Sequence, residues 1–161
     1  VALICGHTAE GAMGIVINRV TDRTLADVFQ QMEIDGSHSA QRTQPVYVGG
    51  PVQGNRGFVV HEPVGSWEST LTVGESLGIS TSRDIIAAIA SDRGPQRYLL
   101  ALGYAGWSPG QLEREIAENS WLAGPADRQI IFDTPVEARW EAAVKRLGVD
   151  LAALSSEAGH A

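Results

Sequence analysis

The chain has 161 residues, of which 43% are hydrophobic, so it is long enough to fold as one domain (residues 1–161) around a substantial core. Its net charge of −7 argues against direct nucleic-acid binding and against anionic membranes, which need concentrated lysine and arginine. A single cysteine excludes an internal disulfide and fits a reducing, cytoplasmic compartment, and no apolar run is long enough to span a membrane.

The beginning of the chain is expected to form two strands and a helix. Residues 1–5 and 13–18 are apolar runs joined by a glycine-containing connection, which predicts a hairpin or tight turn. Thr24 begins an N-terminal capping signature, and apolar residues follow at helical spacing from Leu25 to Met32. This pattern predicts an amphipathic helix.

The middle of the chain is rich in short strands and turns. Residues 46–48 and 57–61 are expected to be antiparallel partners, and residues 67–73 alternate in polarity like a half-exposed strand. Residues 77–79 indicate a further strand. A helix is expected to follow, with an apolar inner face over residues 85–90.

The last third centres on residues 97–102, an apolar run typical of a strand covered on both faces. Ser108 is the expected N-cap of the next helix, and Gln111 would complete a capping box. Residues 130–132 are predicted to form a strand, and Thr134 is predicted to cap the last helix.

Strands that alternate with helices predict an α/β fold. We expect a mixed sheet flanked by helices, an α/β/α sandwich-like single domain with a hairpin-rich middle section. Open sheets of this kind bind ligands where strands turn into helices. Residues 97–112, a strand followed by a glycine-hinged turn and a helix start, form such a unit.

Seven short motifs run through the chain in order, at residues 11–14 (GAMG), 49–52 (GGPV), 56–58 (RGF), 81–84 (TSRD), 102–107 (LGYAGW), 110–113 (GQLE) and 158–161 (AGHA). Together they resemble the AlgH/YqgE family of bacterial proteins. The resemblance implies a single-chain α/β fold, a cytoplasmic location and no established activity, although some members are labelled as transcriptional regulators. Members carry a stretch before the position of Val1, so the first strand of the sheet is expected to be absent from this sequence.

Residues 106–110 match the G-x-S-x-G pattern of a hydrolase nucleophile, with Ser108 at its centre and His160 downstream as a base. That motif uses the backbone N–H after the serine to stabilise an oxyanion, and Pro109 has no N–H. We therefore favour the interpretation of Ser108 as a helix cap over a Ser108/His160 enzyme.

Cys5 and His7 are two residues apart, so they share a face of an extended strand. A neighbouring imidazolium would activate the thiol, and the resemblance implies Cys-x-His at this position. The alternative, which we favour, is a buried cysteine beside a solvent-facing histidine. Together with His61 and His160 these residues show no metal-ligand spacing, so no metal is predicted.

Two helix starts, near Ser82 and Ser108, offer unsatisfied N–H groups that attract anions, and Arg83 and Arg56 would add positive charge. The alternative is that these residues are caps and surface arginines. Trp107 lies in a glycine-flanked turn, where it would either form a contact surface with a neighbouring tyrosine or pack on the following helix.

No set of nucleophile, base and orienting group stands out, so we predict a non-enzymatic module with no cofactor that binds a small ligand or a protein partner. The alternative is an enzyme with a Cys5/His7 or Ser108/His160 pair. A homo-oligomer is compatible with the sequence. The predicted binding residues are Cys5, His7, Asn18, Gly49, Gly50, Pro51, Arg56, Thr81, Ser82, Arg83, Tyr104, Gly106 and Trp107.

Overall fold

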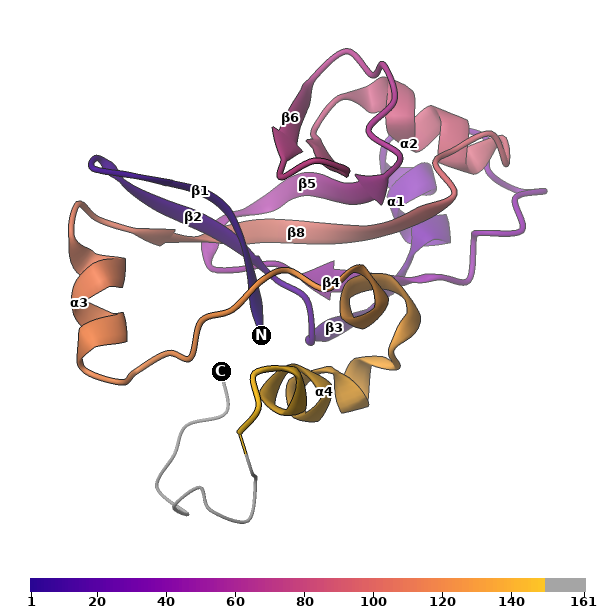
Figure 1. Ribbon diagram of the computed structural model, residues 1–161. Helices are drawn as coiled ribbons and strands as arrows, with labels where there is room; N and C mark the ends of the chain where they lie inside the picture. Colours follow the sequence, from indigo (N-terminus) through magenta and orange to yellow (C-terminus); the bar gives the residue numbers. More distant parts are fainter. Residues whose placement is uncertain (150–161) are drawn as a thin grey trace.

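The computed structural model describes residues 1–149 (Figure 1). Its strands are β1 (Ala2–Thr8), β2 (Gly11–Val16), β3 (Val20–Thr24), β4 (Pro45–Val48), β5 (Val52–Glu62), β6 (Thr70–Val73), β7 (Leu77–Ser80) and β8 (Arg97–Trp107). Its helices are α1 (Leu25–Gln31), α2 (Arg83–Ala90), α3 (Gln111–Ala117), α4 (Arg139–Arg146), a π-helical turn η1 (Gln129–Asp133) and a 3₁₀ turn η2 (Val136–Ala138).

Strand β8 is the centre of the sheet. One of its edges pairs with β5, which leads on to β7 and β6. The other edge is shared, because β4 pairs in parallel with the first half of β8 and β2 pairs antiparallel with its second half. Strand β1 follows β2, and β3 follows β4. The sheet therefore forks along β8 into two branches.

The two faces of the sheet carry separate cores. Leu99 and Ala101 of β8 point into one core, where Ile131 of η1 covers the sheet. Leu100 points into the other core, which α1 and α2 fill with residues such as Phe29 and Ile85. Because successive side chains of β8 enter opposite cores, consecutive residues of this strand are apolar.

The mixed α/β fold is confirmed, but the sandwich description holds only in part. Helices α1 and α2 lie on one face, whereas the other face is covered by short turns and α4 (Figure 1). Helix α3 packs at the far end of the sheet, beyond β1 and β2 (Figure 1). In the described residues, the face opposite α1 and α2 is therefore covered by η1, η2 and α4 and not by a layer of several helices.

The strand predicted at residues 130–132 is wrong, because these residues lie in η1. The Asp127 carboxylate accepts hydrogen bonds from the N–H groups of Gln129 and Ile130, which caps a helical turn. A three-residue apolar run fits either a strand or one helical turn. Strand β3 was not predicted, because most of its residues are exposed and polar.

Two caps also differ from the prediction. Helix α3 has Gly110, not Ser108, at its N-cap, and φ at Gly110 is 75°. Gln111 Oε1 nevertheless accepts a hydrogen bond from the Ser108 backbone N–H at 2.9 Å. Thr134 donates its hydroxyl to the Gln129 carbonyl instead of capping a helix, and α4 begins only at Arg139.

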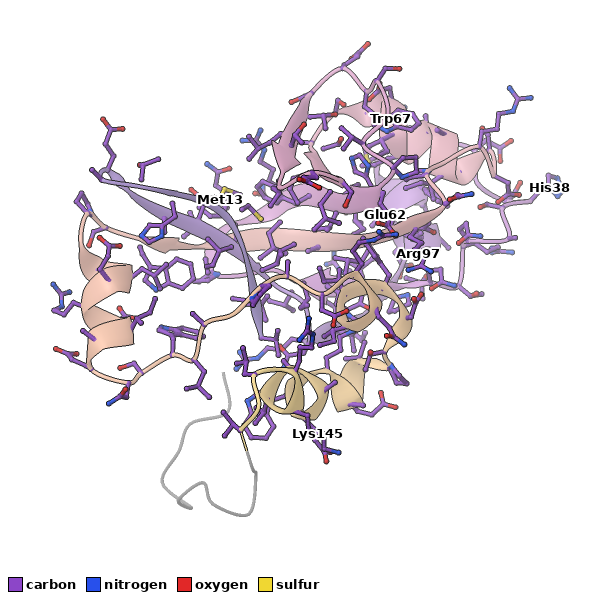
Figure 2. The ribbon with its side chains drawn as sticks, viewed as in Figure 1. Met13, His38, Glu62, Trp67, Arg97 and Lys145 are labelled. Carbon is purple, nitrogen blue, oxygen red and sulfur yellow. The ribbon has the colours of Figure 1, made fainter. Side chains whose placement is uncertain are left out.

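Ion pairs hold η1 against the end of the sheet. The Glu62 carboxylate is buried and lies 2.6 Å from Arg128 Nε and 3.5 Å from Arg97 Nη1. Arg97 also pairs with Asp133 at 2.9 Å. Glu62 and Arg97 lie close together beside η1 (Figure 2). None of the helices within residues 1–149 is long and apolar enough to cross a membrane.

Candidate functional site

The glycine motifs meet where the sheet forks. A Cβ atom on Gly49 would lie 2.2 Å from the Gly103 carbonyl oxygen, and one on Gly103 would lie 2.4 Å from the Gly50 carbonyl oxygen. Gly103 also has φ of +76°. Gly49 N donates to Leu102 O and Gly49 O accepts from Val16 N, both at 2.8 Å. Glycine is needed here because two backbones cross in contact.

Tyr104 and Arg56 lie next to this crossing. The Tyr104 ring is half-buried and meets the Phe58 ring edge-on at a centroid distance of 5.7 Å. The Arg56 guanidinium lies 5.6 Å from the Phe58 ring centroid and donates to Gln53 Oε1. Pro51, which comes just before β5, and Gly106, in β8, are both exposed. The structure therefore brings Tyr104 and Arg56 together around the Phe58 ring.

Thr81 and Ser82 connect β7 to α2, and Arg83 is the first residue of α2. Ser82 Oγ accepts from Ser69 N at 3.1 Å, and the Thr81 and Ser69 hydroxyls are 3.1 Å apart. Arg83 Nη1 donates to the Met32 carbonyl at the end of α1, at 2.7 Å. This predicted group ties a loop and a helix end to α2.

Cys5 and His7 have different surroundings. Cys5 is buried, its thiol donates to the Leu3 carbonyl at 3.4 Å, and burial raises its pKa to about 12. His7 is exposed and its Nε2 pairs with the Glu113 carboxylate of α3, which lowers the pKa of Glu113. A bulge at Cys5, between Ile4 and Gly6, interrupts the ladder between β1 and β2. The buried thiol lacks the electropositive, accessible setting of a reactive cysteine.

Ser108 is exposed, and its hydroxyl donates to Gln111 Oε1 at 3.1 Å. His160, the predicted base, lies outside the described residues. Asn18 Oδ1 accepts a hydrogen bond from the Val1 nitrogen at 2.9 Å. Within residues 1–149, no group of three or more histidine, cysteine or acidic residues is arranged to hold a metal ion.

The structure contains a serine–histidine pair that the sequence did not single out. Ser80 Oγ lies 2.7 Å from His61 Nε2, and His61 Nδ1 lies 3.0 Å from the Pro63 carbonyl oxygen. Since a carbonyl only accepts, Nδ1 carries the hydrogen and Ser80 donates to Nε2. Both residues are completely buried, and burial lowers the pKa of His61. The pair therefore joins β5 to β7 and cannot meet a substrate.

Arg139 is a second buried polar residue that the periodicity did not reveal. Its Nη1 donates to the Ile17 carbonyl at 2.6 Å and its Nε to the Thr134 carbonyl at 2.9 Å. The guanidinium carbon lies 5.2 Å from the Tyr47 ring centroid. These contacts attach the start of α4 to the sheet. The spacing of apolar residues in the sequence does not reveal that the charged Arg139 is buried and joins α4 to the sheet.

One cavity of the described residues is a largely apolar groove of about 240 Å³, which we call the β1 groove. It is lined chiefly by residues 1–4, Leu112 and Ile116 of α3, residues 121–127, Ile130, Ile131, and Ala143 and Leu147 of α4. Leu122 and Ile116 leave 55% and 36% of their surface exposed. Among the predicted binding residues, only Trp107 lines this groove.

Two tryptophans stiffen one wall of the β1 groove. The Trp107 and Trp121 rings meet edge-on at 5.9 Å, and both indole N–H groups donate to Glu115 Oε1, at 3.3 and 2.9 Å. The hydrogen bond from Trp121 is the main cause that lowers the pKa of Glu115. At the other end, Arg146 pairs with Asp127 at 3.2 Å. Glu115 therefore joins the two indole rings, and Asp127 and Arg146 form an ion pair within the groove lining.

Comparison with known proteins places the chain among UPF0301 and AlgH proteins. A UPF0301 protein of Nitrosococcus oceani is 52% identical over all 161 residues, which correspond to 86% of that protein. A UPF0301 protein of Thioalkalivibrio sulfidiphilus is 53% identical, again over the whole chain and 86% of the relative.

Two solved structures are similar. The solution structure of the AlgH protein from Pseudomonas aeruginosa has a TM-score of 0.81 and 48% identity, covering 99% of this chain and 85% of that one. A crystal structure of a Corynebacterium diphtheriae protein shares the fold alone, with a TM-score of 0.69, 19% identity and coverage of 90% and 75%. The family model described as AlgH-like matches residues 1–152, so the chain belongs to the AlgH-like family.

Proposed function

We propose that this chain is a non-catalytic binding module that takes apolar groups of a ligand or protein partner into the β1 groove. The observation that carries the proposal is the open, largely apolar lining of the groove. Ile116 and Leu122 both belong to this lining and both remain exposed. Exposed apolar residues that line one concave site are typical of ligand and protein contacts.

The state of the candidate nucleophiles supports a non-catalytic role. The Cys5 thiol is buried with a raised pKa, and the Ser80 hydroxyl is completely buried. Ser108 is followed by Pro109, which has no N–H for an oxyanion. None of these three groups lines the β1 groove.

The resemblance to AlgH/YqgE proteins adds an expected regulatory role. With a net charge of −7, that role is better served by binding a protein or small ligand than by direct contact with DNA. The single cysteine supports a reducing, cytoplasmic setting for this binding.

Titration with the uncharged fluorescent probe N-phenyl-1-naphthylamine tests the proposal. We expect saturable binding of one probe per chain, with quenching of the Trp107 and Trp121 emission. The variant Leu122→Asp should bind the probe at least about tenfold more weakly, because it sets a charge in the apolar wall.

The matched control is Leu71→Asp, which changes an equally exposed leucine on β6, away from the groove. It should bind the probe like the unmodified chain. Unsaturable binding, or equal losses in the two variants, would show that the β1 groove is not the site.

A further inference from the structure

The ladder between β5 and β8 is interrupted at one point, beside the fork of the sheet. Val52 pairs with Tyr104 and Gly57 pairs with Leu102, so residues 53–56 of β5 stand where β8 has a single residue. Extra residues in one strand bulge out of the sheet and re-aim their side chains, and such bulges are common next to functional sites. All of residues 53–56 are exposed. We call this segment the β5 bulge.

The β5 bulge is held in a strained backbone conformation. Gln53 has φ of 49°, in the left-handed region that favours glycine. Strain of this kind persists only where the surrounding structure fixes it, and it gathers at sites that clamp a ligand. The Gln53 side chain is engaged as well, because its Oε1 accepts a hydrogen bond from Arg56 Nη1 at 3.3 Å. The strained residue therefore orients Arg56 across the bulge.

Arg56 is an oriented guanidinium with most of its donors unused. Its guanidinium carbon lies 5.6 Å from the Phe58 ring centroid, and Tyr104 meets that ring edge-on. Within residues 1–149 its only hydrogen bond is the one to Gln53, and no carboxylate pairs with it. A guanidinium held by a ring and by one side-chain oxygen is preorganised for an acceptor with two oxygens, such as a carboxylate or phosphate.

The strands around Arg56 carry no negative charge. The chain has 19 aspartate and glutamate residues, yet β2, β8 and residues 48–61, which meet at the fork, contain none of them. Where a guanidinium stands on a surface free of carboxylates, the local potential attracts anions although the whole chain has a net charge of −7. The charge of the surroundings therefore favours an oxyanion as the occupant.

Apolar surface lies next to the guanidinium. Gly106 is exposed, and a Cβ built on it would lie 3.7 Å from the Tyr104 ring and 3.9 Å from the Val52 side chain. Tyr104 and Val52 therefore lie side by side, and Val52 leaves 37% of its surface exposed. Because Tyr104 also contacts the ring on which Arg56 rests, an oxyanion at Arg56 can set an apolar group on this surface. An organic anion fits both features better than an inorganic one.

We propose that the β5 bulge binds a small organic oxyanion, a carboxylate or a phosphate ester, whose oxygens accept hydrogen bonds from Arg56 and whose apolar part rests on Tyr104 and Val52. The Asn55 side chain lies on the same bulge, makes no hydrogen bond within residues 1–149, and is available as a further donor. None of these residues lines the β1 groove, so the inference is independent of the proposed function.

Titration of the ¹⁵N-labelled chain at constant ionic strength tests the site. The probes are benzoate and phenyl phosphate, and their uncharged counterparts are benzamide and phenol. We expect saturable binding of a charged probe, with shifts of the Arg56 Nε–H, the Asn55 side-chain amide and the Gly106 amide. The uncharged counterparts should bind at least about tenfold more weakly, and the tighter charged probe identifies the head group.

Two variants and a control assign the binding to the bulge. Arg56→Gln should bind the charged probe at least about tenfold more weakly, whereas Arg93→Gln, at an exposed arginine after α2, should bind it unchanged. Gln53→Gly separates binding from stability. Glycine accepts the positive φ, so the midpoint of urea unfolding should hold or rise, while the lost acceptor for Arg56 weakens binding at least about threefold.

The opposite results would overturn the proposal. Equal binding of charged and uncharged probes, or equal losses in Arg56→Gln and Arg93→Gln, means that Arg56 holds no oxyanion. Unchanged binding by Gln53→Gly means that the bulge does not orient the guanidinium. The complete product of the gene is titrated in parallel, because the curated relatives extend beyond the matched region. It should show the same shifts, and none at Arg56 would mean that the site is closed in that protein and that the proposal is wrong.

Discussion

The fork of the sheet and the β1 groove differ in how tightly their residues are packed. At the fork, Gly49 and Gly103 bring two backbones so close that a single added carbon atom would collide with a carbonyl oxygen. In the β1 groove, Leu122 and Ile116 stand apart and leave apolar surface open. The fork carries most of the recognisable motifs, and the groove carries almost none.

The difference teaches that a glycine-rich motif marks a backbone constraint before it marks a ligand. Gly50 and Tyr104 were predicted as binding residues, and they lie where β4, β2 and β8 exchange partners. Open space formed instead where an edge strand faces a loop and two helices. Substitutions that act on one region but not on the other test this division.

Gly103→Ala should have the largest effect. The variant combines a φ of +76° with a contact of 2.4 Å to Gly50 O, and we expect it to lower the free energy of unfolding by about 3–5 kcal/mol. Urea unfolding measures this loss. Gly54→Ala is the control, since nothing lies within 4 Å of its added carbon. Similar losses in the two variants would contradict the crossing as the reason for glycine.

Glu62→Gln should have the next largest effect, because this buried carboxylate holds Arg128 and Arg97 against the end of the sheet. We expect a loss of about 2 kcal/mol, moderated because both arginines are partly exposed and regain water. Glu141→Gln, which breaks an exposed pair with Lys145, should cost less than about 0.5 kcal/mol. Equal costs would mean that Glu62 does not anchor η1.

The pH dependence of stability should reveal His61. Burial lowers its pKa in the folded state, so the unfolded chain binds a proton more readily as pH falls below the ordinary histidine pKa of about 6.5. The free energy of unfolding should therefore rise from pH 5 to pH 7. Urea unfolding of His61→Gln should show a shallower slope, whereas His38→Gln, at an exposed site, should keep it. An unchanged slope in His61→Gln would contradict the buried, neutral ring.

Ser108→Ala should have the smallest effect. Gly110 occupies the N-cap of α3, and the Ser108 hydroxyl makes one exposed bond to Gln111. We expect a change below about 0.5 kcal/mol in urea unfolding, compared with the roughly 1 kcal/mol of a true serine cap. A larger loss would mean that Ser108 caps the helix after all.

Much of the fold was predictable because the spacing of apolar residues and the lengths of the apolar runs were unambiguous. The apolar run at residues 97–102 predicted the central strand, and the helical spacing from Leu25 predicted α1. Residues 130–132 were assigned to a strand because three apolar residues carry no period. Strand β3 was missed because its main-chain pairing with β4 leaves exposed polar side chains.

The candidate site was less predictable, for a physical reason. The β1 groove is lined by residues 1–4, α3, residues 121–127 and α4, which lie far apart in the sequence and come together only in the folded chain. The opposite wall, residues 121–127, has neither a helical nor a strand period. Of the motif residues in the described part of the chain, Trp107 and Leu112 line the groove, because β8 ends next to the start of α3.

The most direct test of the account maps amide chemical shifts of the ¹⁵N-labelled chain during titration with N-phenyl-1-naphthylamine. The account predicts that the largest changes fall on residues of the β1 groove, such as Ile4, Ile116 and Leu122. Largest changes at Gly50 and Tyr104 instead would contradict it, because the ligand would then sit at the fork.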